Sequence, residues 1–271
     1  MTAKQPDAVG KPGKAKVRND PRTLHLASFL EPGKLPRIPA KHDLIKKMRH
    51  PLRMMLNFNL HNCTCAAAAH MAACWTSHTG VEKSISDKAI LRAYCKISGY
   101  NPVTHKNDIG ACALDVLNYW RKTGIGRDKI LAFASVNHRK RELVKQAVYL
   151  FGGVYAGLQL PKSIIGQKEW EIPEEGLKGK GRRGSFGGHA VSVLSYNQQG
   201  LTCISWGIAK KMSWAFWEAY ADEAYALISK DFFKGKRTPN GFNLKTMEAD
   251  LSKITRQKVT FAKQLAKLQD A

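Results

Sequence analysis

Two cysteines lie where a polar segment passes into an alanine-rich run, and this junction is the first candidate for chemistry. Residues 57–62 are mostly polar, Cys63 and Cys65 follow, and residues 66–69 are all alanine. The pattern predicts a turn that leads into a helix whose small side chains allow close packing. A cysteine at the start of a helix lies near the positive end of the helix dipole, which stabilises the thiolate and lowers the thiol pKa. The sequence thus indicates an activated cysteine; the alternative is that Cys63, Cys65 and Cys74 are only small buried residues.

A histidine in the second half of the chain is the natural partner for such a cysteine. His189 follows two glycines and begins an apolar alternation over residues 187–196, which predicts a strand. Residues 197–200 predict a turn, and residues 201–207 a hairpin partner that ends in Ser-Trp-Gly. A lone histidine on a strand is usually a core residue. The preceding glycines permit close approach of another backbone, which favours a site.

The order of these three motifs resembles the papain-like cysteine peptidase superfamily, in a diverged bacterial or phage-type branch. The motifs are a cysteine at a helix start, a histidine on a hairpin strand, and Ser-Trp-Gly on the return strand, all within residues 35–233. The resemblance implies an α+β fold with a helical N-terminal half packed against an antiparallel β-sheet half and the active-site cleft between them. It also implies a hydrolase or peptidase that cleaves a peptide or amide bond through a thioester, and acyl transfer to another amine shares that intermediate.

The resemblance assigns roles residue by residue. Cys63 would be the nucleophile and His189 the general base and acid. Asn57, six residues before Cys63, would form the oxyanion hole with the Cys63 backbone N–H, although the family has a glutamine there. Asn59 precedes Cys65 by the same six residues, so the spacing leaves both cysteines open. Cys63 is preferred because the residues after it continue as helix.

One position departs from the family pattern. The family places a histidine-orienting asparagine directly before Ser-Trp-Gly, and this chain has Ile204, which cannot form a side-chain hydrogen bond. Ser205 or Asn197 could take that place, or a Cys–His dyad could suffice. The departure keeps an alternative function open, which is a catalytically inactive papain-fold protein that binds a polyanion or assembles with a protein partner. By position, the residues expected to contact substrate are Gly110, Gly188 and Trp206.

Local patterns predict the remaining elements. Helices are expected over residues 84–98, 111–123 and 139–151, and strands over residues 129–136 and 154–160 besides the hairpin. Residues 176–184 are too rich in glycine for regular structure. The adjacent pair Asp222 and Glu223 is interpreted as helix-surface acids. Helices therefore precede an antiparallel sheet, which indicates the α+β class.

Composition and charge suggest partners and compartment. The 271 residues include 44 Lys and Arg against 21 Asp and Glu, a net charge of +23, so non-specific nucleic-acid binding through a basic surface is one expectation. The basic loop over residues 178–183 precedes His189, which favours an acidic peptide or protein substrate. Six cysteines without framework spacing, and an N-terminus unlike a signal peptide, indicate a cytoplasmic protein. Non-classical secretion and association with a virion stay open.

The expected domain organisation has three parts. Residues 1–22 form a disordered basic tail, residues 23–242 the papain-like domain, and residues 243–271 an amphipathic helix suited to self-association or to docking on its own domain. No run of eighteen apolar residues exists, so no membrane span is expected. A metal cluster of His61, Cys63, Cys65 and His70 fits no structural zinc spacing. Neither a metal nor another cofactor is therefore expected.

Overall fold

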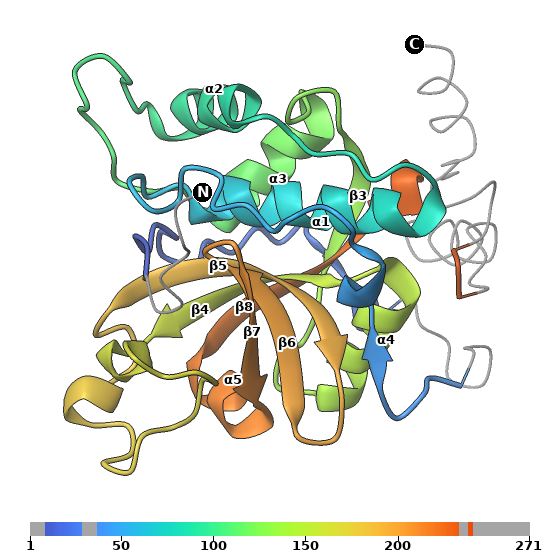
Figure 1. The fold of residues 1–271 in the computed structure, drawn as a ribbon, viewed down its shortest axis with the longest axis vertical. Helices are drawn as coiled ribbons and strands as arrows, with labels where there is room; N and C mark the ends of the chain where they lie inside the picture. The colour runs from blue at the N-terminus through green and yellow to red at the C-terminus, as the bar shows by residue number, and fades with distance from the viewer. Residues whose placement is uncertain (1–8, 29–36, 233–237, 241–271) are drawn as a thin grey trace.

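The fold combines five α-helices with a mixed sheet in the described part of the chain, residues 9–28, 37–232 and 238–240 of a computed structural model (Figure 1). The helices are α1 Cys63–Thr79, α2 Asp87–Ser98, α3 Ala113–Lys122, α4 Arg141–Phe151 and α5 Trp214–Tyr220. The strands are β1 Leu24–His25, β2 His42–Asp43, β3 Ile130–Ser135, β4 Val154–Leu160, β5 Gly187–Tyr196, β6 Gly200–Ser205, β7 Ile208–Ser213 and β8 Ala221–Ser229. Short 3₁₀ helices cover Leu26–Ser28, Ile45–Lys47, Lys162–Ile164, Gly179–Gly181 and Lys230–Phe232.

The sheet has the strand order β1-β3-β8-β4-β5-β6-β7, and β2 pairs with β5 beside this path. Every pairing is antiparallel except β1 with β3. Helices α1, α2 and α3 lie together on one side of the sheet in Figure 1, with α1 next to β5. This arrangement confirms the predicted α+β class, with a helical first half against a mostly antiparallel second half.

Helix α1 is enclosed by the rest of the protein. All residues from Cys63 to Thr76 are buried and only the last three are half-buried, so up to Thr76 the helix has no solvent face and needs no amphipathic stripe. Its alanines leave room for the sheet, and hydrogen bonds connect the two layers. Ser192 Oγ donates to Ala67 O at 2.9 Å, and Tyr155 OH donates to Thr64 O at 3.0 Å. These bonds fix the first turn of α1, and therefore Cys63, against strands β4 and β5.

Most predicted elements are confirmed. Strands β4 and β5 have the predicted bounds, and the three predicted helices and strand β3 differ from theirs by at most three residues at either end. Ser86 caps α2 by accepting from Ala89 N, and Gly99 ends it in the left-handed conformation at φ 76°. Local signals are reliable here because capping and alternation act within a few residues.

The prediction for Asp222 and Glu223 was wrong. Both lie on strand β8, which follows the short helix α5, and not on a helix surface. The spacing of apolar residues changes from that of a helix in α5 to that of a strand in β8, because the helix ends and the strand begins at Ala221.

Within the described residues no helix is long and apolar enough to cross a membrane.

Residues 9–15 are not part of the solvated tail that their composition suggested, whereas residues 16–22 are mostly exposed. Lys14 is buried, and the backbone of this segment is hydrogen-bonded to three distant parts of the chain, at Asn57, Ala111 and Gly188. Residues 1–8 and the amphipathic helix predicted over residues 243–271 lie outside the described residues. The domain boundaries at residues 23 and 242 stay predictions.

The close packing of α1 can be tested with one enlarged side chain. Ala68 is fully buried in α1, so Ala68→Leu should overpack the contact with the sheet and lower the free energy of unfolding by about 1–3 kcal/mol. Ala215→Leu makes the same change at an exposed position of α5 and should stay within about 0.5 kcal/mol. Urea unfolding of both variants measures the difference. Equal stabilities would show that α1 has spare space around it.

Candidate functional site

The thiol of Cys63 is buried at the first residue of α1. Its exposed fraction is 1%, its Sγ accepts from the backbone N–H of Ala190 at 3.4 Å, and the backbone amides of Gly13 and Thr64 lie close enough to favour the thiolate. Burial raises the pKa of the thiol to about 11, and the amide donors oppose that effect without offsetting it. The expectation of a lowered pKa was therefore wrong for this arrangement, because loss of water outweighs the helix start.

His189 lies on β5, where its ring contacts Ser205 and Trp206. Its Nε2 is 2.9 Å from Ser205 Oγ, and its ring stacks on Trp206 with centroids 4.2 Å apart. Its Nδ1 is buried and makes no hydrogen bond to any described residue. Burial lowers the pKa of His189 to about 3, so the imidazole is neutral at pH 7.

Strand β5 brings the backbone next to His189 into contact with the thiol, and within the described residues no hydrogen bond joins the two side chains themselves. Ala190, which donates to Cys63 Sγ, directly follows His189 in the sequence. Cys65 is also fully buried, and burial raises its pKa further, to about 12. Of the two cysteines, Cys63 is the one whose sulfur accepts a hydrogen bond from β5. The structure thus supports Cys63 as the candidate nucleophile.

Of the two residues that the sequence offered as hydrogen-bond partners of His189, Ser205 is the one that contacts it. Its hydroxyl contacts His189 Nε2, whereas Asn197 Oδ1 accepts from the backbone N–H groups of Gln199 and Gly200 in the β5–β6 turn. Ile204 is buried, and side chains alternate between the faces of a strand. A side chain at position 204 of β6 therefore points away from the face that Ser205 presents.

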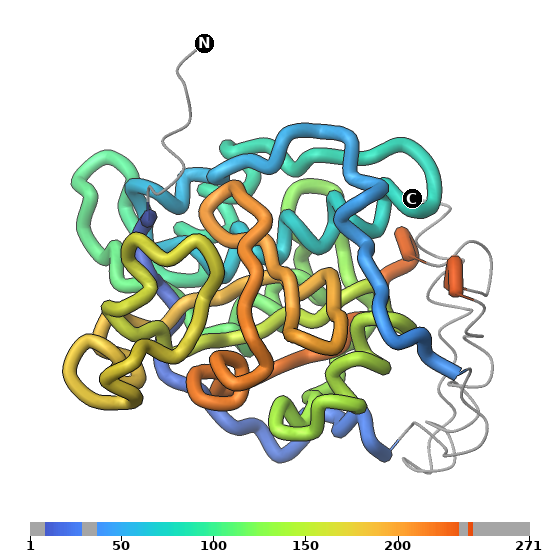
Figure 2. Tube along the Cα trace, turned by 60° about the horizontal axis from the view of Figure 1, so that its bottom comes forward, coloured from blue at the N-terminus to red at the C-terminus, as the bar shows by residue number. Residues whose placement is uncertain are grey.

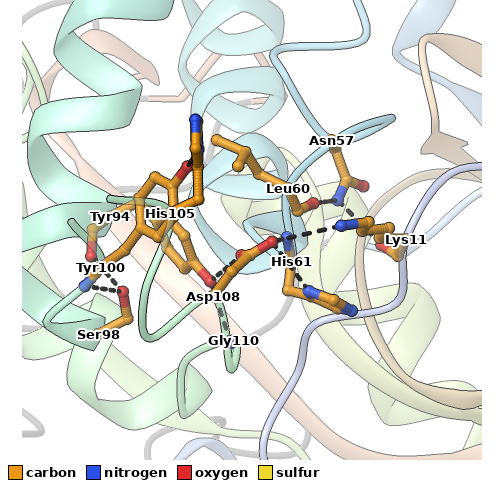
Figure 3. A network of polar contacts seen from close by, with 10 residues as sticks. All are labelled: Lys11, Asn57, Leu60, His61, Tyr94, Ser98, Tyr100, His105, Asp108 and Gly110. Atoms are coloured by element: carbon orange, nitrogen blue, oxygen red, sulfur yellow. Dashed lines mark hydrogen bonds and ion pairs between the residues drawn. The ribbon is translucent and has the colours of Figure 1, made fainter. Parts of the chain in front are cut away.

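The turn before Cys63 is held by a network around Asp108 (Figure 3). Asp108 Oδ1 accepts from the His61 backbone N–H at 2.9 Å and from Tyr94 OH at 2.7 Å. His61 Nδ1 and Lys11 Nζ lie 3.1 and 3.5 Å from Asp108 Oδ2. Burial raises the pKa of Asp108, but the hydrogen bonds from His61 and Tyr94 outweigh it and the net shift is downward. The carboxylate thereby anchors the loop that delivers Cys63.

Asn57 lies in the same turn and directs its amide at peptide carbonyls. Its Nδ2 donates to the carbonyl oxygens of Lys11 and Leu60, both at 3.0 Å. The side chain is buried, with the residue 2% exposed. Figure 3 shows this amide between the turn and Lys11. Both N–H groups of the amide are therefore used by protein carbonyls, and the one that donates to Lys11 O is free for the role predicted for Asn57 only when Lys11 moves away.

A segment that sequence reasoning missed covers the site. Residues 9–15 are hydrogen-bonded to both sides of it: Lys11 N donates to Asn57 O at 3.0 Å, and Lys14 N donates to Gly188 O at 2.8 Å. Ala111 N donates to Gly13 O at 2.9 Å. In Figure 2 this dark-blue segment runs beside the loops that precede α1 and α3.

The three residues predicted to contact substrate all lie against this segment. A Cβ on Gly110 would come within 2.0 Å of Gly13 O, and one on Gly188 within 2.2 Å of Lys14 O. A Cβ on Gly10 would come within 2.5 Å of Trp206 Cδ1. The path that the segment takes between Asn57, Gly110 and Gly188 is called the groove below, and its glycines leave space for a peptide backbone. Among the described residues no group of three or more His, Cys, Asp or Glu is arranged to hold a metal ion.

Comparison with known proteins agrees with this geometry at the level of the fold. No protein-family model and no curated protein matches the chain. Among solved structures, xylellain, a cysteine protease from Xylella fastidiosa, matches with a TM-score of 0.62 and 16% identity, over 84% of this chain and 99% of that one. ProCathepsin B S9 from Trypanosoma congolense matches with a TM-score of 0.56 and 12% identity, over 83% and 87%.

A third structure extends the comparison to a plant enzyme. The Carica candamarcensis cysteine protease CMS1MS2, solved in complex with E-64, matches with a TM-score of 0.51 and 15% identity, over 71% of this chain and 99% of that one. At these identities the similarity concerns the fold. The chain therefore has the papain-like fold that these cysteine proteases share.

Proposed function

We propose that this protein is a papain-like cysteine hydrolase that cleaves a peptide or amide bond. One observation carries the proposal: β5 places His189 directly before the residue that contacts Cys63 Sγ, with Ser205 on the far nitrogen of the imidazole. The papain-like fold of the chain supports the same conclusion.

In the proposed first step, His189 accepts the proton of the Cys63 thiol. If Nε2–H donates to Ser205 Oγ, then Nδ1 carries the lone pair, and Nδ1 is the nitrogen that makes no other hydrogen bond to the described residues. The thiolate attacks the substrate carbonyl carbon, and the carbonyl oxygen becomes an oxyanion. The Asn57 amide and the Cys63 backbone N–H would stabilise that charge, a kind of contribution worth about 10²–10³ in rate elsewhere.

The second half of the reaction returns the proton. As the C–N bond breaks, the imidazolium of His189 donates its proton to the leaving amine, and a thioester with Cys63 remains. Water then attacks the thioester carbonyl with His189 as base, which releases the carboxylic acid and restores the thiol. Attack by a second amine in place of water would transfer the acyl group.

For any substrate to reach Cys63, residues 9–15 must leave the groove. In the closed arrangement the Gly13 amide is one of the backbone groups next to the sulfur, and the segment is hydrogen-bonded to Asn57 and Gly188 on either side, so it blocks access to the thiol. The same cover excludes water and so accounts for the raised thiol pKa. Opening the groove would restore water to Cys63 and lower that pKa.

The first test measures the thiol directly. At pH 7 Cys63 of the full chain should react with iodoacetamide more slowly than the half-buried Cys95. Lys14→Gln removes the buried ion pairs that anchor the segment and should raise the Cys63 rate constant by roughly tenfold or more. Adding His189→Ala should cancel this gain, because the thiolate loses its proton acceptor. Mass spectrometry assigns the labelled cysteine.

Two results would contradict the proposed chemistry. One is that Cys63 in Lys14→Gln reacts no faster than Cys65; the other is that its reactivity survives His189→Ala. Either result would favour the inactive binding protein, for which salt-sensitive retention on heparin is the next measurement.

Ser205 should act as a positioning residue. Ser205→Ala removes the hydrogen bond to His189 Nε2 and should slow Cys63 alkylation in the Lys14→Gln background by about tenfold to 100-fold. Ser205→Thr keeps the hydroxyl and should recover most of that loss. A merely structural role predicts lower thermal stability in Ser205→Ala with an unchanged pH dependence of alkylation, and that outcome would exclude positioning.

The buried histidine also predicts how stability depends on pH. The pKa of His189 is about 3 in the folded protein and about 6.5 in the unfolded chain, so between these values only the unfolded chain binds the proton. Stability is therefore complete above pH 6.5 and falls as the pH drops toward 3. From pH 7 to pH 5 the loss from this group should be about 2 kcal/mol.

Urea unfolding of His189→Gln is the matched measurement, because glutamine cannot take up the proton. This variant should lose less stability than the wild type between pH 7 and pH 5. Some loss should persist, since burial lowers the pKa of His70 to about 4 as well. Equal losses in the two proteins would show that His189 titrates normally.

A further inference from the structure

Beside the thiol, the covering segment places a lysine in a buried acidic pocket. The Lys14 side chain has no exposed surface, and its Nζ lies 3.0 Å from Asp222 Oδ2 and 2.9 Å from Glu223 Oε1. It also donates to Ala15 O at 3.0 Å. Burial alone would lower the pKa of Lys14, but the two carboxylates outweigh it and the net shift is upward. A buried ammonium is costly unless paired, so this pocket is built for a cation.

The carboxylates are held by the sheet and do not depend on Lys14 for their positions. Gln159 Nε2 donates to Asp222 Oδ2 at 2.6 Å, and Tyr225 OH donates to Glu223 Oε2 at 2.9 Å. The side chains of Asp222 and Glu223 are 9% and 4% exposed with Lys14 in place. With Lys14 removed, both carboxylates would stay anchored and would face the empty pocket.

A bulge in the sheet aims both acids at one point. Neighbouring side chains normally point to opposite faces of a strand. Here Gly157 pairs with Glu223 while Leu158 pairs with Ala221, so Asp222 is an extra residue on β8. Bulges of this kind redirect a side chain, and this one brings two consecutive carboxylates to the same ammonium.

Glycine at position 157 shapes the channel for the lysine stem. A Cβ on Gly157 would lie 2.7 Å from Lys14 Cδ and 2.6 Å from Asp222 Oδ1. Any larger residue there would displace the stem or a carboxylate. The pocket thus fits a long, thin side chain with a positive end.

The pocket opens on the groove next to the proposed catalytic pair. Lys14 N donates to the carbonyl of Gly188, the residue before His189, and Ala15 N donates to Ala111 O at 3.0 Å. The backbone amide of Gly13, the residue before Lys14, is one of the groups close enough to Cys63 to favour its thiolate. A peptide in the groove would therefore carry a side chain into this pocket within a residue or two of the thiol.

We propose that the Asp222–Glu223 pocket is a specificity subsite for the lysine or arginine side chain of a peptide substrate, and that Lys14 occupies it within the same chain. The inference rests on the proposed function as far as a bond is cleaved. Binding of the basic side chain in the pocket does not require catalysis. A neutral side chain would leave two buried carboxylates unpaired, and an acidic one would add a third negative charge. The earlier expectation of an acidic substrate, drawn from the loop at residues 178–183, conflicts with this pocket.

The test uses full-length Lys14→Gln and short peptides that end in a thiol-reactive vinyl sulfone. Two peptides differ only in one side chain, lysine or the uncharged norleucine, and the substituted position is moved along the peptide one residue at a time. At the position that reaches the pocket, the lysine peptide should modify Cys63 at least tenfold faster than the norleucine peptide. In wild type both should react slowly, because Lys14 competes.

Carboxylate variants show whether the pocket causes the preference. Asp222→Asn combined with Glu223→Gln in the Lys14→Gln background should abolish the advantage of lysine. Because that variant changes three buried residues, its folding is checked by circular dichroism. The lysine-to-norleucine ratio in Lys14→Gln alone tests the proposal even if the combined variant does not fold.

The possible failures can be told apart. If Cys63 is modified but lysine has no advantage at any position, the subsite is wrong and the proposed function stands. If no reagent modifies Cys63, the proposed function fails. The subsite is then judged by calorimetric binding of the same peptides without the vinyl sulfone to Lys14→Gln, where equal affinities for lysine and norleucine would overturn it.

Discussion

The close contact between helix α1 and strand β5 is the constraint on which the site depends. Alanines on the helix and hydrogen bonds such as Ser192 Oγ to Ala67 O set the distance between the two layers. Because Cys63 is the first residue of the helix and His189 the third residue of the strand, that distance also sets the relation between thiol and imidazole. Buried interiors tolerate little change of volume, so the pair is positioned by packing across the whole layer and not by local loops.

Desolvation controls the protonation of the pair. In the closed arrangement burial raises the pKa of Cys63 to about 11 and lowers that of His189 to about 3, so both groups are neutral at pH 7. Neither the start of a helix nor two amide N–H groups overcomes the loss of water. The segment over residues 9–15 contributes to that loss, and its position therefore decides whether a thiolate–imidazolium pair can form.

The sequence predicted the features that depend on neighbouring residues. The bounds of β5 followed from alternation and from the turn at residues 197–200. The roles of the cysteine, histidine and tryptophan rest on the order of the motifs and stay predictions. What could not be predicted depends on tertiary register. The bulge that directs Asp222 to the same ammonium as Glu223 is defined by pairing with Gly157, about 65 residues earlier in the chain. Likewise, only the pairing of β6 with β5 decides that Ser205, and neither Ile204 nor Asn197, contacts His189.

The covering segment shows how composition can mislead. Residues 10–16 are glycine, lysine, proline and alanine, which on their own predict a solvated tail. In the groove the same composition is what fits: a Cβ on Gly13 would come within 1.9 Å of His61 O, and one on Gly10 within 2.5 Å of Asn57 O. Glycines bury little apolar surface, so the segment is held mainly by backbone hydrogen bonds and by the ion pairs of Lys14. A peptide with a positively charged side chain would compete with Lys14 for the acidic pocket and so displace the segment. Recognition in the acidic pocket is therefore linked to access to Cys63.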